Sequence, residues 1–199
     1  ALQSDYVDER AAAAESLCQS GCDAADAAVE LVKAVGDEDS VSQWAVAELE
    51  EIGTPPTSTL DKLTKLLSHR IPIVAYWSAT LLLRLGPASK ASERELASLL
   101  SSSEDQAVKE RAAWALGKIG NQRAVATLIA VVRNMDNATD TRHAAAMALG
   151  EIAQPTSYEA VADLAEDYPE VSICRALKRA AARCRVASPT ASDFDGLRP

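Results

Sequence analysis

The chain has 199 residues, 48% of them hydrophobic but only 4% aromatic, so its core must be built mainly from alanine, leucine, valine and isoleucine. Its net charge of −9 would repel a phosphate backbone or an anionic membrane surface, and we expect neither nucleic acid nor membrane as a partner. No apolar run approaches the ~20 residues that span a bilayer, and the polar, acidic start is unlike a signal peptide. Because the first residue is not Met, we expect a fragment of a longer chain.

The four cysteines do not form the pattern of a disulfide framework. Cys174 and Cys184 are expected on one helix, about 15 Å apart, which is too far for a bond. A bridge between Cys18 and Cys22 is conceivable near a helix end, but four reduced thiols are the favoured interpretation. The compartment stays open, with a cytoplasmic location favoured.

An internal repeat dominates the rest of the chain. Gly21, Gly53, Gly86 and Gly120 are separated by 32, 33 and 34 residues, and Ala153 follows 33 residues later. We call these five the closing residues. A glycine at the end of a helix adopts positive φ without steric cost, so each closing residue is expected to end a helix.

The segment before each closing residue has one apolar stripe. A leucine always stands four residues before it, a small residue eight before it, and in three segments a valine twelve before it. These offsets lie on one face of a 3.6-residue helix. The sequence therefore predicts a series of second helices, at 10–21, 42–53, 75–86, 109–120 and 142–153, with a last helix near Val171–Cys184.

Between these segments lie shorter apolar clusters that predict first helices, around 29–35, 60–67, 96–100, 125–132 and 161–164. The sequences Ser92-x-x-Glu95 and Thr156-x-x-Glu159 have the form of capping boxes at two of their starts. One helix pair cannot bury its apolar face alone, whereas a stack of pairs buries a continuous core.

The second-helix pattern resembles the HEAT family, and in particular the bacterial short HEAT repeats also found in phycobilin lyases. The clearest copies are VKERAAWALGKIG (108–120) and TRHAAAMALGEIA (141–153), with weaker copies at 41–53 and 74–86. The resemblance covers about residues 8–185. We expect an all-α protein, an α-solenoid of about five to six antiparallel helix pairs stacked in a right-handed superhelix. Residues 1–186 would form this single array and 187–199 a flexible C-terminal tail.

The resemblance also implies that the second helices line a concave surface, where a protein or peptide partner would bind. Candidate partner-binding residues on that surface include all three tryptophans, which lie outside the core stripe. Two interpretations stay open: an aromatic groove for an extended peptide, or large side chains that fill gaps in an alanine-rich core. The candidates are Trp44, Tyr76, Trp77, Glu110, Arg111, Trp114, His143 and Met147.

The last helix carries a stripe of basic residues in an otherwise acidic chain. It is interpreted either as a polar cap of the array or as a secondary face that docks an acidic partner. Its residues are Arg175, Lys178, Arg179 and Arg183.

Catalysis finds little support in the sequence. His69 and His143 are the only histidines and stand about two repeats apart, and no nucleotide-binding, zinc-protease or serine-hydrolase motif is present. We therefore expect a protein-interaction scaffold, not an enzyme, with no cofactor and no metal. Two alternatives remain. One is a phycobilin-lyase-like enzyme, and the other a nucleic-acid-binding protein that would use Arg84, Arg111 and Lys118 on a face that also carries Glu51, Glu110 and Glu151.

Overall fold

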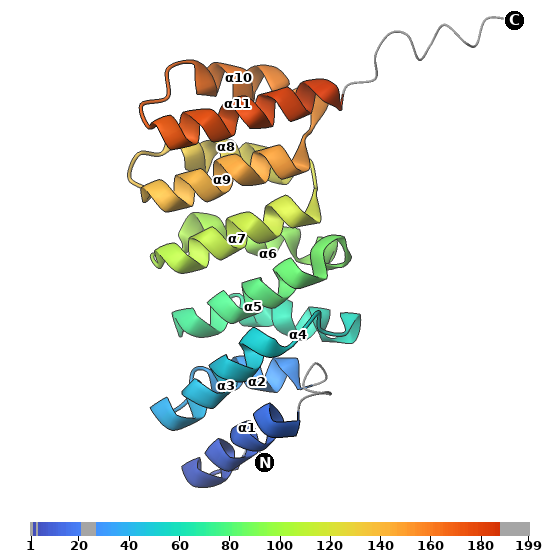
Figure 1. Ribbon diagram of the computed structural model, residues 1–199, viewed down its shortest axis with the longest axis vertical. Helices are drawn as coiled ribbons and strands as arrows, with labels where there is room; N and C mark the ends of the chain where they lie inside the picture. Colours follow the sequence, from blue (N-terminus) through green and yellow to red (C-terminus); the bar gives the residue numbers. More distant parts are fainter. Residues whose placement is uncertain (1, 3, 21–26, 188–199) are drawn as a thin grey trace, which may run out of the picture.

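The computed structural model describes residues 2, 4–20 and 27–187, and within them the chain is helical with no strand. The helices form two layers of a stack, so the α-solenoid expected from the repeat is confirmed (Figure 1). Residues 188–199, most of the expected tail, lie outside the described part. No helix of the described part is both long and apolar enough to cross a membrane. The first helices are α2 (Ala28–Ala34), α4 (Leu60–Leu66), α6 (Glu93–Ser102), α8 (Ala124–Arg133) and α10 (Tyr158–Glu166).

The second helices form the other layer, and α1, which has no first helix before it in the described residues, continues this layer (Figure 1). Short 3₁₀ turns precede three of the first helices, at Thr57–Thr59, Gly86–Ser92 and Pro155–Ser157. The members of the layer are α1 (Val7–Ser20), α3 (Asp39–Glu51), α5 (Pro72–Leu85), α7 (Gln106–Ile119), α9 (Thr139–Ile152) and α11 (Val171–Val186).

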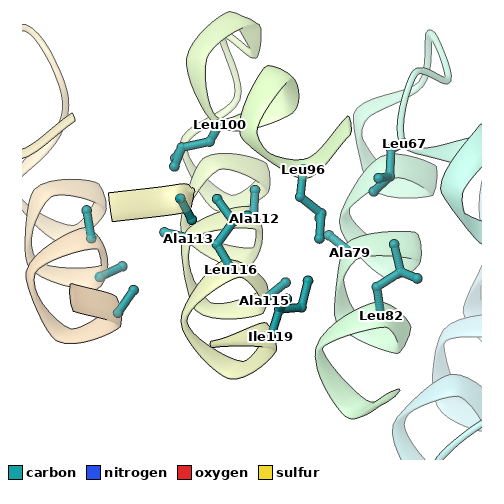
Figure 2. Close-up of a cluster of buried hydrophobic side chains, with 14 of the residues drawn as sticks. Leu67, Ala79, Leu82, Leu96, Leu100, Ala112, Ala113, Ala115, Leu116 and Ile119 are labelled. Carbon is teal, nitrogen blue, oxygen red and sulfur yellow. The ribbon is translucent and has the colours of Figure 1, made fainter. Parts of the chain in front are cut away.

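The core lies between the two layers, where the expected stripes meet. The leucines four residues before the closing residue are buried in α3, α5, α7 and α9, as are the small residues eight before it. Figure 2 shows this packing around α7, where Leu116 and Ile119 lie near Leu96 of α6 and Leu82 of α5. The core is thus continuous along the array, as a stack of mutually dependent pairs requires.

Neighbouring second helices approach very closely at glycine. A Cβ on Gly117 of α7 would lie 2.8 Å from the Cα of Ala148 in α9, so only glycine fits at that position. The next interface is looser, because a Cβ on Gly150 would lie 3.4 Å from the Cα of Ala180 in α11. The alanine-rich composition is therefore used to bring backbones together between repeats.

The expected capping boxes do not form. Ser92 and Thr156 belong to the 3₁₀ turns that lead into α6 and α10, and neither hydroxyl caps a helix. The Ser92 hydroxyl instead pairs with the hydroxyl of Thr64, and Thr156 accepts a hydrogen bond from Gln122. A side-chain cap does occur at α7, where Asp105 accepts a hydrogen bond from the backbone N–H of Val108.

The closing residues behave as expected at three of the four described positions. Gly86 and Gly120 have positive φ at the ends of α5 and α7, and Ala153 shares the left-handed conformation of Gly120, with φ 46°, at the end of α9. Gly53 does not end its helix: α3 stops at Glu51, and Ile52 is already extended. Gly21 lies outside the described residues. Ala153 is therefore an alanine in a conformation that suits glycine.

We expect Ala153→Gly to raise the free energy of unfolding by about 1 kcal/mol, because glycine removes the Cβ strain of the left-handed conformation. The reciprocal change, Gly120→Ala, should lower it by a similar amount, since an added Cβ there meets nothing within 4 Å and only φ opposes it. Urea unfolding of both variants tests this. Equal stability of Ala153→Gly and the wild type would contradict the assignment of strain.

Candidate functional site

The exposed side of the second-helix layer is formed by three residues from each helix, ten, six and two positions before the closing residue. These offsets differ by four, so the three side chains lie along one stripe of the helix. All are exposed or half-buried except Thr80. We call this surface the second-helix face. From α3 to α9 it consists of Gln43, Ala47 and Glu51; Tyr76, Thr80 and Arg84; Glu110, Trp114 and Lys118; and His143, Met147 and Glu151.

The candidate aromatic residues divide between this face and the core. Trp44 is exposed, at 38%, whereas Trp77 at the same register is 6% exposed, and its indole N–H has no acceptor among the described residues. Trp114 and Tyr76 are half-buried. Trp77 therefore has the packing role that was the alternative to the groove, and the accessible aromatic surface comes from Trp44, Tyr76 and Trp114.

The polar candidates surround these rings. The guanidinium of Arg111 lies 4.9 Å from the centre of the Tyr76 ring, which in turn meets Trp77 edge-on at 5.6 Å. This cation–π contact fixes Tyr76 between α5 and α7. Burial, with a smaller contribution from Asp140, raises the pKa of Glu110 above its ordinary value. His143 and Met147 are half-buried on α9 and continue the same face.

The basic residues of α11 extend the second-helix face. Arg183 donates a hydrogen bond of 2.8 Å to Glu151, which places it beside the last residue of the α9 stripe. Arg175 and Arg179 precede Arg183 at spacings of four, so they share its stripe. All three arginines and Lys178 are exposed. The aromatic and polar candidates are therefore continuous with these three arginines, whereas Lys178 lies on the side of α11 that faces Tyr158 and Asp163 of α10.

Arg84 has a structural task that the sequence did not reveal. It reaches from α5 to the end of α3 and donates hydrogen bonds to the carbonyls of Leu49 and Ile52, at 2.8 and 2.5 Å. The last carbonyls of a helix have no partner within it, and α3 has no basic residue in its own last turn. Arg84 therefore caps the neighbouring repeat, and burial lowers its pKa. Because its guanidinium is bonded to α3, Arg84 is not available to bind a nucleic acid, as the nucleic-acid alternative required.

A recurrent contact with the following pair starts from the position eleven residues before the closing residue, which carries a basic side chain in α1, α7 and α9. Arg10 binds Asp37 with bonds of 2.5 and 2.8 Å, and Lys109 binds Asn137 at 3.0 Å. In both cases the acceptor lies in the turn between the two helices of the following pair. We call this the turn-binding position.

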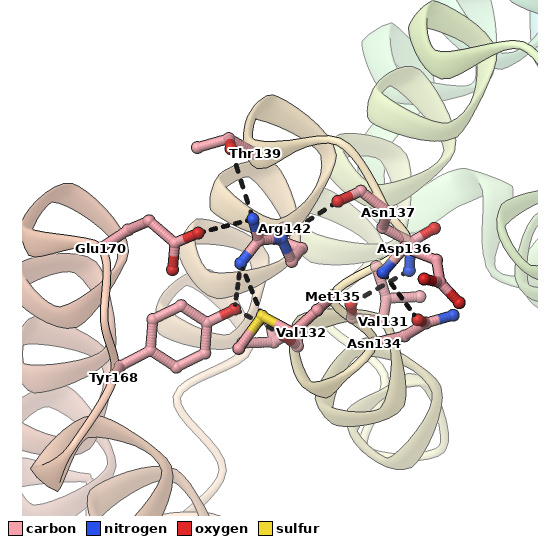
Figure 3. Close-up of polar contacts among 10 residues, drawn as sticks. All are labelled: Val131, Val132, Asn134, Met135, Asp136, Asn137, Thr139, Arg142, Tyr168 and Glu170. Carbon is pink, nitrogen blue, oxygen red and sulfur yellow. Dashed lines mark hydrogen bonds and ion pairs between the residues drawn. The ribbon is translucent and has the colours of Figure 1, made fainter.

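Arg142 occupies the turn-binding position of α9 and is the most elaborate case. Its side chain, 6% exposed, donates to Glu170 at 2.6 Å and to the Tyr168 hydroxyl at 3.0 Å in the α10–α11 turn (Figure 3). It also donates to the carbonyl of Asn137 before α9. The Tyr168 hydroxyl in turn donates a hydrogen bond to the carbonyl of Val132. These bonds raise the pKa of Arg142, and its guanidinium lowers that of Glu170.

This position was not predicted to join the pairs, although the sequence contains a signal for it. Arg10, Lys109 and Arg142 fall at one register of the repeat, next to the valine stripe, and a basic residue there is unexpected on a core-facing side. Ser42 and Ala75 hold the same register in α3 and α5, which hid the pattern. The hydrogen-bond acceptors also differ from one repeat to the next: an aspartate, an asparagine, and a tyrosine together with a glutamate.

Arg142→Leu should lower the free energy of unfolding by about 2–4 kcal/mol, because it leaves buried hydrogen-bonding groups without their partner. The exposed Arg133→Leu is the matched control and should change little. The loss of stability caused by Arg142→Leu should be smaller in acid. Because the folded-state pKa of Glu170 is lowered, its ion pair with Arg142 stabilises the fold fully above the ordinary pKa of 4.5, and this stabilisation is lost as the pH falls through the lowered pKa. Urea unfolding at pH 7 and pH 3 tests both points. A deficit equal to that of Arg133→Leu would contradict the assigned role.

The described residues contain no group of three or more His, Cys, Asp or Glu side chains that could hold a metal ion. Cys174 and Cys184 both lie on α11, as the sequence predicted, and no disulfide joins them. Cys18 and Cys22 fall outside what the structure describes for side chains.

Comparison with known proteins agrees with this architecture. Residues 93–182 match the family model described as HEAT repeats. No curated protein matches the sequence. A designed armadillo repeat protein in complex with the peptide (KR)4 superposes with a TM-score of 0.65 at 16% identity, covering 92% of this chain and 95% of that one.

Two further solved structures give the same result. An engineered protein has a TM-score of 0.64 at 20% identity, covering 93% of this chain and 96% of that one. Human deoxyhypusine hydroxylase, in complex with glycerol, has a TM-score of 0.56 at 22% identity and covers 87% of this chain and 67% of that one. At these identities the likeness shows the fold alone. The family match therefore identifies HEAT repeats at residues 93–182, and the solved structures show that the array as a whole has the fold of such repeat proteins.

Proposed function

We propose that this protein is an interaction scaffold that binds an extended segment of a partner protein along the second-helix face. The observation that carries the proposal is the continuity of this face, from Tyr76 through Trp114 and Met147 to the arginines of α11, with the exposed Trp44 next to Gln43 at its edge. Repeat folds of the HEAT and armadillo kind commonly serve as protein-binding scaffolds, and the designed armadillo neighbour is in complex with a peptide.

The side chains on this face suit a partner with both apolar and acidic residues. Trp114 and Met147 offer large, half-buried contact areas on adjacent helices. Such side chains typically carry much of the energy of an interface. Three exposed arginines follow on α11, and only Arg183 has an ion-pair partner among the described residues. A segment that places an aromatic or aliphatic side chain near Trp114 could set its carboxylates against Arg175 and Arg179.

The Tyr76 region gives the face a preorganised element. Arg111 and Trp77 hold the Tyr76 ring from two sides, so a partner would meet it already positioned. Near it lies Glu110, which is half-buried, and this burial raises the pKa of its carboxyl. A hydrogen-bond donor or cation on the partner would satisfy this group.

A displayed library of random 16-residue peptides would test the proposal, with affinities of the selected peptides measured by fluorescence anisotropy. We expect selected sequences to combine acidic with aromatic or aliphatic residues. Trp114→Ala should weaken binding about thirtyfold, because truncating a central aromatic anchor costs about 2 kcal/mol. Arg179→Glu should weaken it as well and reduce its dependence on salt.

The matched control is Lys62→Glu, which makes the same change of charge on the exposed surface of α4 in the other layer. It should leave affinity unchanged, and circular dichroism should show all three variants to be folded. Selected peptides that bind Trp114→Ala and Arg179→Glu as well as they bind the wild type would place the binding surface elsewhere.

A further inference from the structure

A cavity of about 960 Å³ lies away from the second-helix face, among α4, α6 and the turns that follow them. Its residues include Ala75 of α5, Leu99 of α6 and Glu104 and Asp105 of the α6–α7 turn. The tryptophans and the α11 arginines do not contribute to it. The proposed function therefore leaves this cavity unused.

The cavity coincides with a gap in the recurrent contact between pairs. Ala75 occupies the turn-binding position of α5, where α1, α7 and α9 have Arg10, Lys109 and Arg142. Those three side chains each donate to the turn of the following pair. For α5 the following turn is the one that carries Glu104 and Asp105, and Ala75 has no side chain to reach it. The basic donor is therefore missing at this junction, as it is at Ser42 of α3, and here the cavity lies between the place of the donor and the turn.

The acceptor side of the same contact is still present. Glu104 stands immediately before the N-cap of α7, as Asp37 stands before that of α3 and Asn137 before that of α9. Asp37 and Asn137 receive the basic side chain of the preceding second helix, whereas Glu104 has no ion pair with any described residue. Asp105 uses one carboxylate oxygen, Oδ1, to cap α7.

The rest of the lining suits a cation on an aliphatic stem. Leu67, Leu99 and Val108 supply apolar surface beside the carboxylates, and such surface packs against methylene groups. The lining contains four carboxylates and two basic side chains, Lys65 and Arg70. Lys65 belongs to α4, as does the carboxylate of Asp61, and Arg70 to the turn after it, and neither basic residue forms an ion pair with another described residue.

We propose that this cavity binds a guanidinium group on an aliphatic stem, such as an arginine side chain, which takes the place of the missing turn-binding residue. The guanidinium would donate to Glu104 as Arg10 donates to Asp37 and Arg142 to Glu170. The stem would lie over Ala75 and Val108. The chain thus contains three internal examples of the contact that the ligand would complete.

The test is an NMR titration of the full chain with Nα-acetyl-arginine methylamide, compared with the citrulline derivative, which has nearly the same shape but no charge. We expect saturable shifts of the backbone amides of Ala75, Glu104 and Val108, with the citrulline derivative at least about tenfold weaker. Agmatine, which has the guanidinium and the stem but no peptide groups, distinguishes the two sources of the ligand. An affinity equal to that of the arginine derivative would indicate a free guanidino compound, and a weaker affinity would indicate an arginine side chain presented by a peptide.

Two variants make the test specific. Glu104→Gln should weaken binding about tenfold, whereas the exposed Glu159→Gln, at the start of α10, should not. Ala75→Arg should block the ligand and raise the melting temperature, and Glu104→Gln should cancel that rise. If Ala75→Arg does not fold, the two glutamate variants decide alone. Equal binding of the arginine and citrulline derivatives, or shifts spread over the whole acidic surface, would overturn the proposal. Both outcomes are independent of peptide binding to the second-helix face.

Discussion

The array depends most on the basic side chains that Arg10, Lys109 and Arg142, at three of the five turn-binding positions, extend to the following pair. An open stack has no contacts beyond nearest neighbours, so each junction must fix its own spacing and orientation. Apolar packing between α7 and α9 brings the backbones within contact at Gly117, but packing alone has little directional preference. Arg142, held by Glu170, Tyr168 and the carbonyl of Asn137, accepts only one arrangement of the two pairs.

The junctions without this contact differ in structure as well as in sequence. At Ser42 the hydroxyl turns back to the carbonyl of Val35 within its own pair, and the two repeats are instead linked by Arg84 at the end of α3. At Ala75 the gap is the cavity that we propose to be a binding site. In the middle of the array a cavity thus lies where the contact is absent. The C-terminal pairs keep the contact, and α11 at their end carries the basic stripe.

The sequence was sufficient for the features that repeat and insufficient for those that occur once. Leu82, Leu116 and Leu149 share a register, so periodicity alone placed the core. The capping boxes were wrong because Ser92 and Thr156 lie in 3₁₀ turns, whose geometry local sequence does not specify. The position in the repeat also could not predict that Trp44 is exposed and Trp77 buried, because the two tryptophans occupy the same position. Their burial depends on the side chains of the neighbouring helices, which the repeat pattern does not fix. The continuity of α11 with the second-helix face required the contact between Arg183 and Glu151.

Native-state hydrogen exchange would test most directly whether the turn-binding contacts hold the pairs together. Lys109 and Arg142 join the pair α8–α9 to the pairs before and after it, whereas the pair α4–α5 has Ser42 and Ala75 at the corresponding positions. Amides of α8 should therefore open at a higher free energy than those of α4, and Lys109→Ala with Arg142→Ala should remove most of that difference. Equal protection of α8 and α4 in the wild type, or protection of α8 unchanged in the double variant, would contradict the account.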